Sequence, residues 1–151
     1  MSKSRILIAD DNPQNVELLE VYLGEEDYEV ATAVDGRDTL EQIARFQPDL
    51  ILLDIKMPKL SGFEVCKIVK DDPATRDVMI LVVTALNEPG DVERAVNVGC
   101  DDFISKPINK LELLKRVKNL LKIRHYADEV ERLRRYIDSM EDEGHPEGDG
   151  P

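Results

Sequence analysis

Acidic, hydroxyl and amine side chains stand directly after four short apolar runs of the sequence. They are Asp10 with Asp11, Asp54, Thr84 and Lys106. If the runs are neighbouring strands, three carboxylates lie close together, and each pair about 4 Å apart repels by about 4 kcal/mol at an effective dielectric constant near 20. Such a cluster needs cations. Lys106 supplies one positive charge, and a divalent metal ion would supply the rest.

The residue types at these points favour magnesium and phosphoryl chemistry. Carboxylate oxygens suit Mg²⁺, and no histidine or cysteine lies nearby in the sequence to favour zinc. A metal, the Lys106 ammonium and the Thr84 hydroxyl can together stabilise a phosphoryl group during transfer. Asp54 is the best candidate for the nucleophile because it stands alone after its run. The adjacent Asp10 and Asp11 are better placed to hold metal.

The elements that must position these residues alternate between two periodicities. Continuous apolar runs fit parallel strands that are covered on both faces, and helical patterns separate them. The expected strands are 5–9, 28–32, 49–53, 78–83 and 102–105, and the expected helices are 13–25, 35–46, 61–70, 88–98 and one that begins at 109. This order predicts an α/β fold with a five-stranded, doubly wound parallel sheet. Ligands in such folds bind at the carboxyl ends of the strands, where the candidate residues stand.

Composition excludes several classes of function. The chain has 151 residues, which suits one domain, and 20 basic against 32 acidic residues give a net charge of −12. That charge argues against direct binding of nucleic acid. No apolar stretch is long enough for a membrane span, and the first residues do not form a signal peptide. Cys66 and Cys100 form no metal or disulfide motif, so we expect reduced thiols and a cytoplasmic protein.

The motifs together resemble the response-regulator receiver domain of bacterial two-component signalling. They are the acidic pair at 10–11, D-I-K-M-P-K-L-S-G at 54–62, T-A at 84–85 and K-P at 106–107. The resemblance covers about residues 4–123, so we expect a receiver domain at 1–123. It implies a flavodoxin-like sheet with strand order 2-1-3-4-5 and helices on both sides.

The resemblance also implies a role for each residue of the site. Asp54 would accept the phosphoryl group, and Thr84 and Lys106 would contact it. Mg²⁺ would be bound directly by Asp11, Asp54 and the backbone carbonyl of Lys56, with Asp10 acting mostly through a metal-bound water. The bond between Lys106 and Pro107 is expected to be cis.

The implied function is a phosphorylation-operated switch. The phosphoryl group would come from a sensor histidine kinase, a phosphotransfer protein or a small phosphodonor. The only expected chemistry is self-phosphorylation and autodephosphorylation, so the chain is not expected to be an enzyme. Phosphorylation would shift Thr84 and Phe103 and alter the face formed by 88–98, 102–105 and the last helix. Phe103 stands where many relatives have a tyrosine.

Three other functions compete with this one. A haloacid-dehalogenase-type phosphatase would need a second aspartate where Lys56 stands. A flavodoxin-like cofactor binder would need a first loop rich in Gly, Ser and Thr, whereas the charge of Asp-Asp-Asn-Pro would repel a phosphate unless a metal intervened. A phosphorylation-independent dimerisation scaffold would not need the complete set of acidic, hydroxyl and amine side chains.

The sequence continues beyond the receiver pattern with a second apolar repeat. Residues 124–140 are expected to form a coiled-coil extension, so that one helix runs from Asn109 to Met140. Its apolar stripe recurs at spacings of three and four: Ile123, Tyr126, Val130, Leu133, Ile137 and Met140. β-Branched residues at the a positions favour a parallel homodimer. An amphipathic helix that packs on its own domain, or frays, remains an alternative, and an acidic tail at 141–151 is expected to be disordered.

Overall fold

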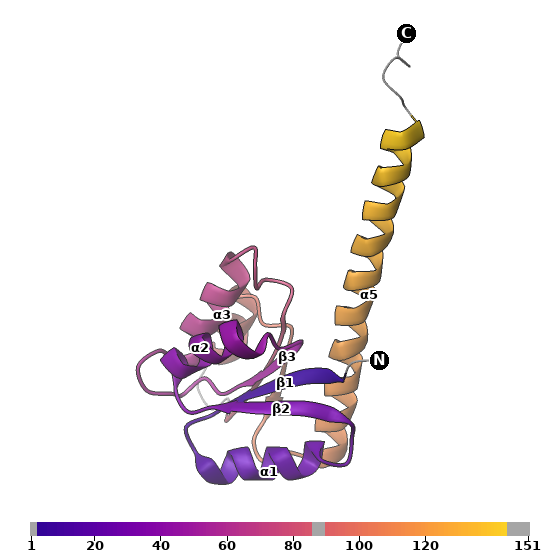
Figure 1. Ribbon diagram of the computed structural model, residues 1–151. Helices are drawn as coiled ribbons and strands as arrows, with labels where there is room; N and C mark the ends of the chain where they lie inside the picture. The colour runs from indigo at the N-terminus through magenta and orange to yellow at the C-terminus, as the bar shows by residue number, and fades with distance from the viewer. Residues whose placement is uncertain (1–2, 86–89, 145–151) are drawn as a thin grey trace.

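The protein folds around one parallel sheet, in the predicted strand order. The computed structural model describes residues 3–85 and 90–144, with side chains to 141. The order β2-β1-β3-β4-β5 confirms the predicted doubly wound fold (Figure 1). The strands are β1 Ser4–Ala9, β2 Tyr28–Ala33, β3 Leu50–Leu53, β4 Met79–Thr84 and β5 Asp102–Ser105.

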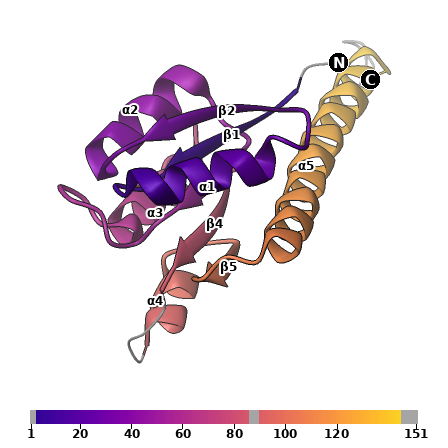
Figure 2. The ribbon, with the colours of Figure 1, turned by 90° about the horizontal axis from the view of Figure 1, so that it is seen from below.

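Helices cover both faces of the sheet. They are α1 Pro13–Leu23, α2 Gly36–Phe46, α3 Gly62–Asp71, α4 Asp91–Asn97 and α5 Lys110–Gly144. One apolar cluster joins the sheet to α2, α3 and α4, and the other joins it to α1 and α5. Figure 1 shows α2 and α3 on one side of the sheet and α1 on the other, and Figure 2 shows α5 along the side of the sheet. Because both faces are covered, β3 and β4 are buried along their whole length.

Local sequence explains where the helices begin. The Asn12 side chain accepts a hydrogen bond from the N–H of Gln14, and Pro13 occupies the first helical position. Ser61 and Glu64 form a capping box at the start of α3. Helix α4 is shorter than the expected 88–98, because it is preceded by Gly90 with a φ of 89°. The expected first residues of that helix, 88 and 89, lie outside the described residues.

Helix α5 continues as one element from the core into the extension. It packs on the sheet through the buried Leu113, Val117 and Leu120. The helix continues past Met140 to Gly144, so the first four residues of the expected acidic tail are helical. No proline interrupts it before position 146. Residues 145–151, where the rest of that tail was expected, lie outside the described residues.

No helix of the described residues is both long enough and apolar enough to cross a membrane.

Candidate functional site

The register of the sheet brings the candidate residues to one edge. In the parallel pairing Ala9 lies opposite Leu53, and Thr84 lies opposite Ser105. The N–H of Asp54 donates to the carbonyl of Ala9 at 2.9 Å, which places Asp54 beside the residue that follows β1. The N–H of Lys106 donates to the carbonyl of Thr84 at 3.0 Å. Residues far apart in the sequence therefore meet at the carboxyl ends of the strands.

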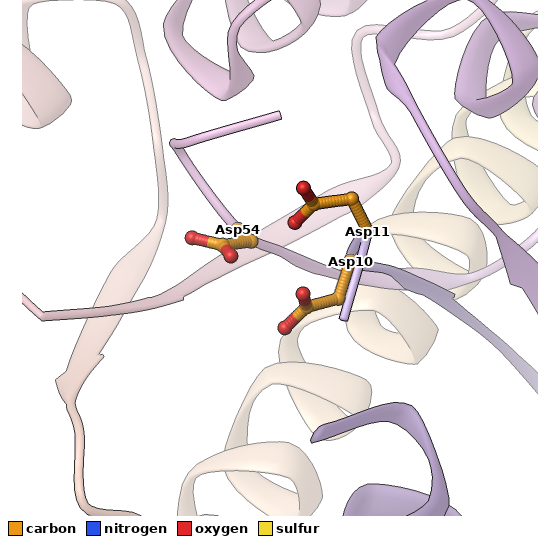
Figure 3. Close-up of side chains that lie close together, drawn as sticks. All are labelled: Asp10, Asp11 and Asp54. Atoms are coloured by element: carbon orange, nitrogen blue, oxygen red, sulfur yellow. The ribbon is translucent and has the colours of Figure 1, made fainter. Parts of the chain in front are cut away.

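Three carboxylates cluster at this edge, as the strand-end positions predict. Asp10, Asp11 and Asp54 each offer an oxygen, and these oxygens lie within 4.8 Å of one another. Figure 3 shows all three side chains pointing to the same side. Asp10 and Asp54 are buried, whereas Asp11 is exposed. The cluster is thus open to solvent on the side of Asp11.

Lys106 is the cation that the cluster requires. Its Nζ lies 3.3 Å from Oδ2 of Asp10 and 3.4 Å from Oδ2 of Asp54. Two backbone N–H groups add hydrogen bonds: Asn12 donates to Oδ1 of Asp10 at 2.9 Å, and Lys56 donates to Oδ1 of Asp54 at 3.3 Å. One ammonium and two amides therefore stabilise two buried carboxylates.

The positive groups do not fully offset the burial of Asp10. Loss of solvent raises the pKa of Asp10, and the nearby Asp54 raises it further. The hydrogen bond from the N–H of Asn12 and the charge of Lys106 lower the pKa, but the net shift is upward. The site therefore favours an additional cation near Asp10.

The donor set fits Mg²⁺. Within the described part of the chain, these three aspartates are the one group of acidic, histidine or cysteine side chains close enough to share an ion. All donors are carboxylate oxygens, which suit a hard divalent cation, and the exposed side leaves room for metal-bound water. Neither cysteine belongs to the group, so the site does not have the ligands of a typical zinc centre.

The loop after Asp54 folds back tightly on its own strand. A Cβ at Gly62 would lie 2.4 Å from the backbone oxygen of Asp54 and 2.7 Å from Cα of Ile55. The N–H of Gly62 donates to the carbonyl of Ile55 at 2.8 Å. Only glycine allows this approach, which fixes the start of α3 against the backbone of the acidic residue.

Thr84 lies at the end of β4 beside the acidic cluster. It is buried, and it lines a hollow of about 460 Å³ together with Lys56, Ser61 and Ala85. Arg94 of α4 lines the same hollow and stacks over the ring of Phe63 at 4.3 Å. Nothing in the sequence pattern marks Arg94 except its place on the helix that follows Thr84.

Phe103 and Pro107 complete the predicted set. Phe103 is half-buried in β5 and packs against the cluster that includes α3 and α4. Its N–H donates to Oδ1 of Asp102 at 2.9 Å. The peptide bond between Lys106 and Pro107 is cis, as expected.

Comparison with known proteins identifies similar chains along most of the length. Residues 6–118 match the family model of the response regulator receiver domain. The response regulator PleD of Caulobacter vibrioides is 45% identical over 127 residues, which are 84% of this chain but 28% of PleD. The chain therefore spans less than a third of that relative. The polar-differentiation response regulator DivK of Brucella ovis is 37% identical over 121 residues, which are 80% of this chain and 98% of DivK.

Solved structures of a response regulator and a receiver domain also resemble this chain. A response regulator from Chloroflexus aurantiacus superposes with a TM-score of 0.76 at 34% identity, and the match covers 80% of this chain and 99% of that one. The receiver domain of the sensor histidine kinase PA1611 from Pseudomonas aeruginosa has a TM-score of 0.74 at 28% identity over 80% of this chain and 99% of that one. The PA1611 structure contains a magnesium ion coordinated in its active site cleft.

Proposed function

Because the chain belongs to the response regulator receiver domain family, we propose that it is a signalling switch operated by phosphorylation of Asp54. The donor is a sensor histidine kinase, a phosphotransfer protein or a small phosphodonor. The observation that carries this proposal is the position of Lys106, whose Nζ lies within 3.4 Å of both Asp10 and Asp54 at the edge where the strands end.

In the proposed reaction a carboxylate oxygen of Asp54 attacks the phosphorus atom. A bond forms between that oxygen and phosphorus, and the bond between phosphorus and the donor's leaving group breaks. Lys106 pairs with the phosphoryl oxygens, and the Thr84 hydroxyl donates a hydrogen bond to one of them. Asp10 and Asp54 hold the ammonium of Lys106 at the site before transfer.

Mg²⁺ is the proposed cofactor. Asp11, Asp54 and the backbone carbonyl of Lys56 hold the ion, and Asp10 acts mostly through a metal-bound water. When bound, the ion neutralises negative charge on the oxygens of the transferring group. The all-oxygen cluster and the magnesium ion in the PA1611 receiver domain both support this assignment.

Phosphorylation changes the surface at the β5 edge of the sheet, which is opposite the β2 edge. We propose that Thr84 moves toward the phosphoryl group, that Phe103 moves inward, and that the face of α4, β5 and α5 changes as a result. This is a population shift caused by a local change of charge. The altered face controls a partner or an output domain, and the chain pairs with a second copy through the C-terminal part of α5.

Lys56 argues against the competing phosphatase function. A phosphatase of the haloacid-dehalogenase type needs a general acid two residues after the nucleophile, and an amine stands there. The chemistry proposed for this chain is therefore limited to its own phosphorylation and dephosphorylation.

Incubation with acetyl phosphate and Mg²⁺, followed by mass spectrometry, tests the proposal. The native chain should gain one phosphoryl group, and Asp54→Asn should gain none. Asp27→Asn, which changes an exposed aspartate far from the site, should be labelled like the native chain. Equal labelling of Asp54→Asn and the native chain would refute the assignment.

A further inference from the structure

A groove runs along one flank of the extended part of α5. The helix contributes Ile123, Tyr126 and Val130, and the segment that leads into β4 contributes Arg76 and Asp77. Its volume is about 710 Å³. Figure 1 shows α5 continuing beyond the rest of the protein, so the groove lies where the helix leaves the domain.

The apolar side of this groove is uncovered in the single chain. All six stripe residues are between 44% and 67% exposed: Ile123, Tyr126, Val130, Leu133, Ile137 and Met140. The alternative that the stripe packs on its own domain is therefore wrong for this conformation. A contiguous apolar surface of this kind usually marks an interaction site.

The charges beside the stripe do not form ion pairs within the chain. Asp77, Lys122, Glu129 and Arg134 have no ion-pair partner among the described residues. Elsewhere on the extension, the helix does form internal pairs, such as Arg124 with Asp128 and Arg135 with Glu131. The four charges beside the stripe are therefore available to pair with another chain.

We propose that the groove holds α5 of a second copy of this chain, in parallel, so that the segment of Arg76 and Asp77 forms part of the interface. This inference rests on the pairing in the proposed function, and it adds that the partner helix also contacts the receiver domain itself. The occupant is a second copy because the stripe has the a and d spacing of a two-stranded coiled coil, with β-branched residues at each a position.

The flanks of the helix fix which charges meet. With Ile123 and Val130 at a, the e positions are Ala127 and Arg134, and both line the groove. In a parallel pair the e side of one helix faces the g side of the other. The g positions carry Lys122 and Glu129.

The two charged g residues find opposite charges in this arrangement. The partner's Glu129 faces Arg134, and the partner's Lys122 faces the end of the groove at Asp77. A two-fold axis repeats each contact, so the four unpaired charges of one chain are all used. The interface is therefore self-complementary in charge.

Sedimentation of the full chain tests the pairing. The native chain should be a dimer at tens of micromolar. Val130→Asp places two carboxylates in the apolar seam and should raise the dissociation constant by at least about tenfold. Val21→Asp is the matched control, because Val21 is a similarly exposed valine on α1 and its change should leave the dimer intact.

Cross-linking between different chains tests whether the partner helix contacts the domain at Asp77. All chains carry Cys100→Ala, and Cys66 is buried with a pKa raised to about 12, so it should not react. A mixture of Asp77→Cys and Lys122→Cys chains, treated with a short bis-maleimide, should give a cross-linked heterodimer. A mixture of Asp77→Cys and His125→Cys chains should give much less, because His125 lies in a different groove beside Ser4.

The outcomes separate this inference from the proposed switch. A monomeric native chain that is still phosphorylated on Asp54 would overturn the pairing and leave the switch intact. A dimer with equal cross-linking in both mixtures would refute the proposed contact between the partner helix and Asp77. A dimer that cannot be phosphorylated would overturn the switch and leave the interface standing.

Discussion

Arg116 on α5 holds Asp102 at the start of β5. Its Nη1 lies 2.8 Å from both carboxylate oxygens of Asp102. One of these oxygens also accepts the N–H of Phe103. The hydrogen bonds with Asp102 raise the pKa of Arg116 further above its usual range. The pair therefore connects the last helix to the backbone of the proposed switch residue.

A double-mutant cycle should detect this connection. We expect Arg116→Gln and Asp102→Asn to show a coupling free energy of up to about 1 kcal/mol, since both side chains are partly exposed. Urea unfolding of the four proteins gives the value. The matched pair Arg135 and Glu131 is more exposed and should couple more weakly. Equal coupling in the two cycles would show that the lower exposure of Arg116 and Asp102 does not strengthen their pairing.

Replacing Asp10 should stabilise the fold at neutral pH. Burial raises the pKa of this carboxyl in the folded chain, so the unfolded chain loses its proton first as the pH rises above about 3.8. The folded state then binds more protons, and the free energy of unfolding falls with rising pH in that window. Asp10→Asn should remove this loss, which urea unfolding at pH 4 and pH 7 without Mg²⁺ can measure.

Asp35 provides the control of opposite sign. The N–H of Asp38 lowers the pKa of Asp35, so its charge stabilises the fold above the unfolded pKa and is lost as the pH falls. Asp35→Asn should therefore reduce the free energy of unfolding at pH 7. A loss of stability in Asp10→Asn as well would show that the ionised Asp10 is favourable in the folded chain.

Mg²⁺ affinity should depend on Asp11. This side chain is exposed, and it offers one of the three clustered oxygens. Asp11→Asn removes a ligand charge and should weaken binding by about tenfold or more, which is about 1.4 kcal/mol. Calorimetric titration measures this, with Asp27→Asn as an exposed control. Unchanged affinity in Asp11→Asn would refute the metal site.

Phosphorylation should change the environment of residues beyond the acidic cluster. We expect amide chemical shifts to move at Thr84 and Phe103 and along α4, β5 and α5, with much smaller changes along α2. Nuclear magnetic resonance spectra before and after acetyl phosphate give this comparison. Shifts confined to Asp10, Asp11 and Asp54 would contradict the coupling.

Gly62→Ala should destabilise the protein by about 1–3 kcal/mol, because the new methyl group would overlap the backbone of Asp54. Thermal or urea unfolding gives the value. Gly24→Ala is the control, since Gly24 has an ordinary φ of −63° and its nearest atom would lie at 3.2 Å. If both substitutions lower the free energy of unfolding by the same amount, the close approach at Gly62 does not explain the loss of stability.

The sequence predicted the sheet and the acidic cluster for the same reason. Continuous apolar runs such as the one before Asp54 fit strands buried on both faces, and the carboxyl ends of parallel strands lie at one edge of the sheet. The residue after each run was therefore placed correctly without any side-chain geometry.

The side-chain contacts between elements were not predictable in this way. A helical spacing of three would place Leu111 and Leu114 together on the core side of α5, yet Leu111 is 78% exposed and Leu113 is buried instead. The rotation of α5 depends on how it packs across the sheet. The same rotation brings Arg116 to Asp102, so nothing in the local sequence indicates that pair.

The continuity of α5 has a mechanical consequence. Its 35 residues form one rod of about 52 Å, whose first turns are buried in the core and whose far end carries the stripe. A rigid rod converts a small tilt at its root into a larger displacement at its tip. A tilt of about 5° would move a point roughly 30 Å away by roughly 2.6 Å, about half the pitch of a helix. The protein therefore has the geometry of a lever, with its fulcrum in the apolar core beside β5.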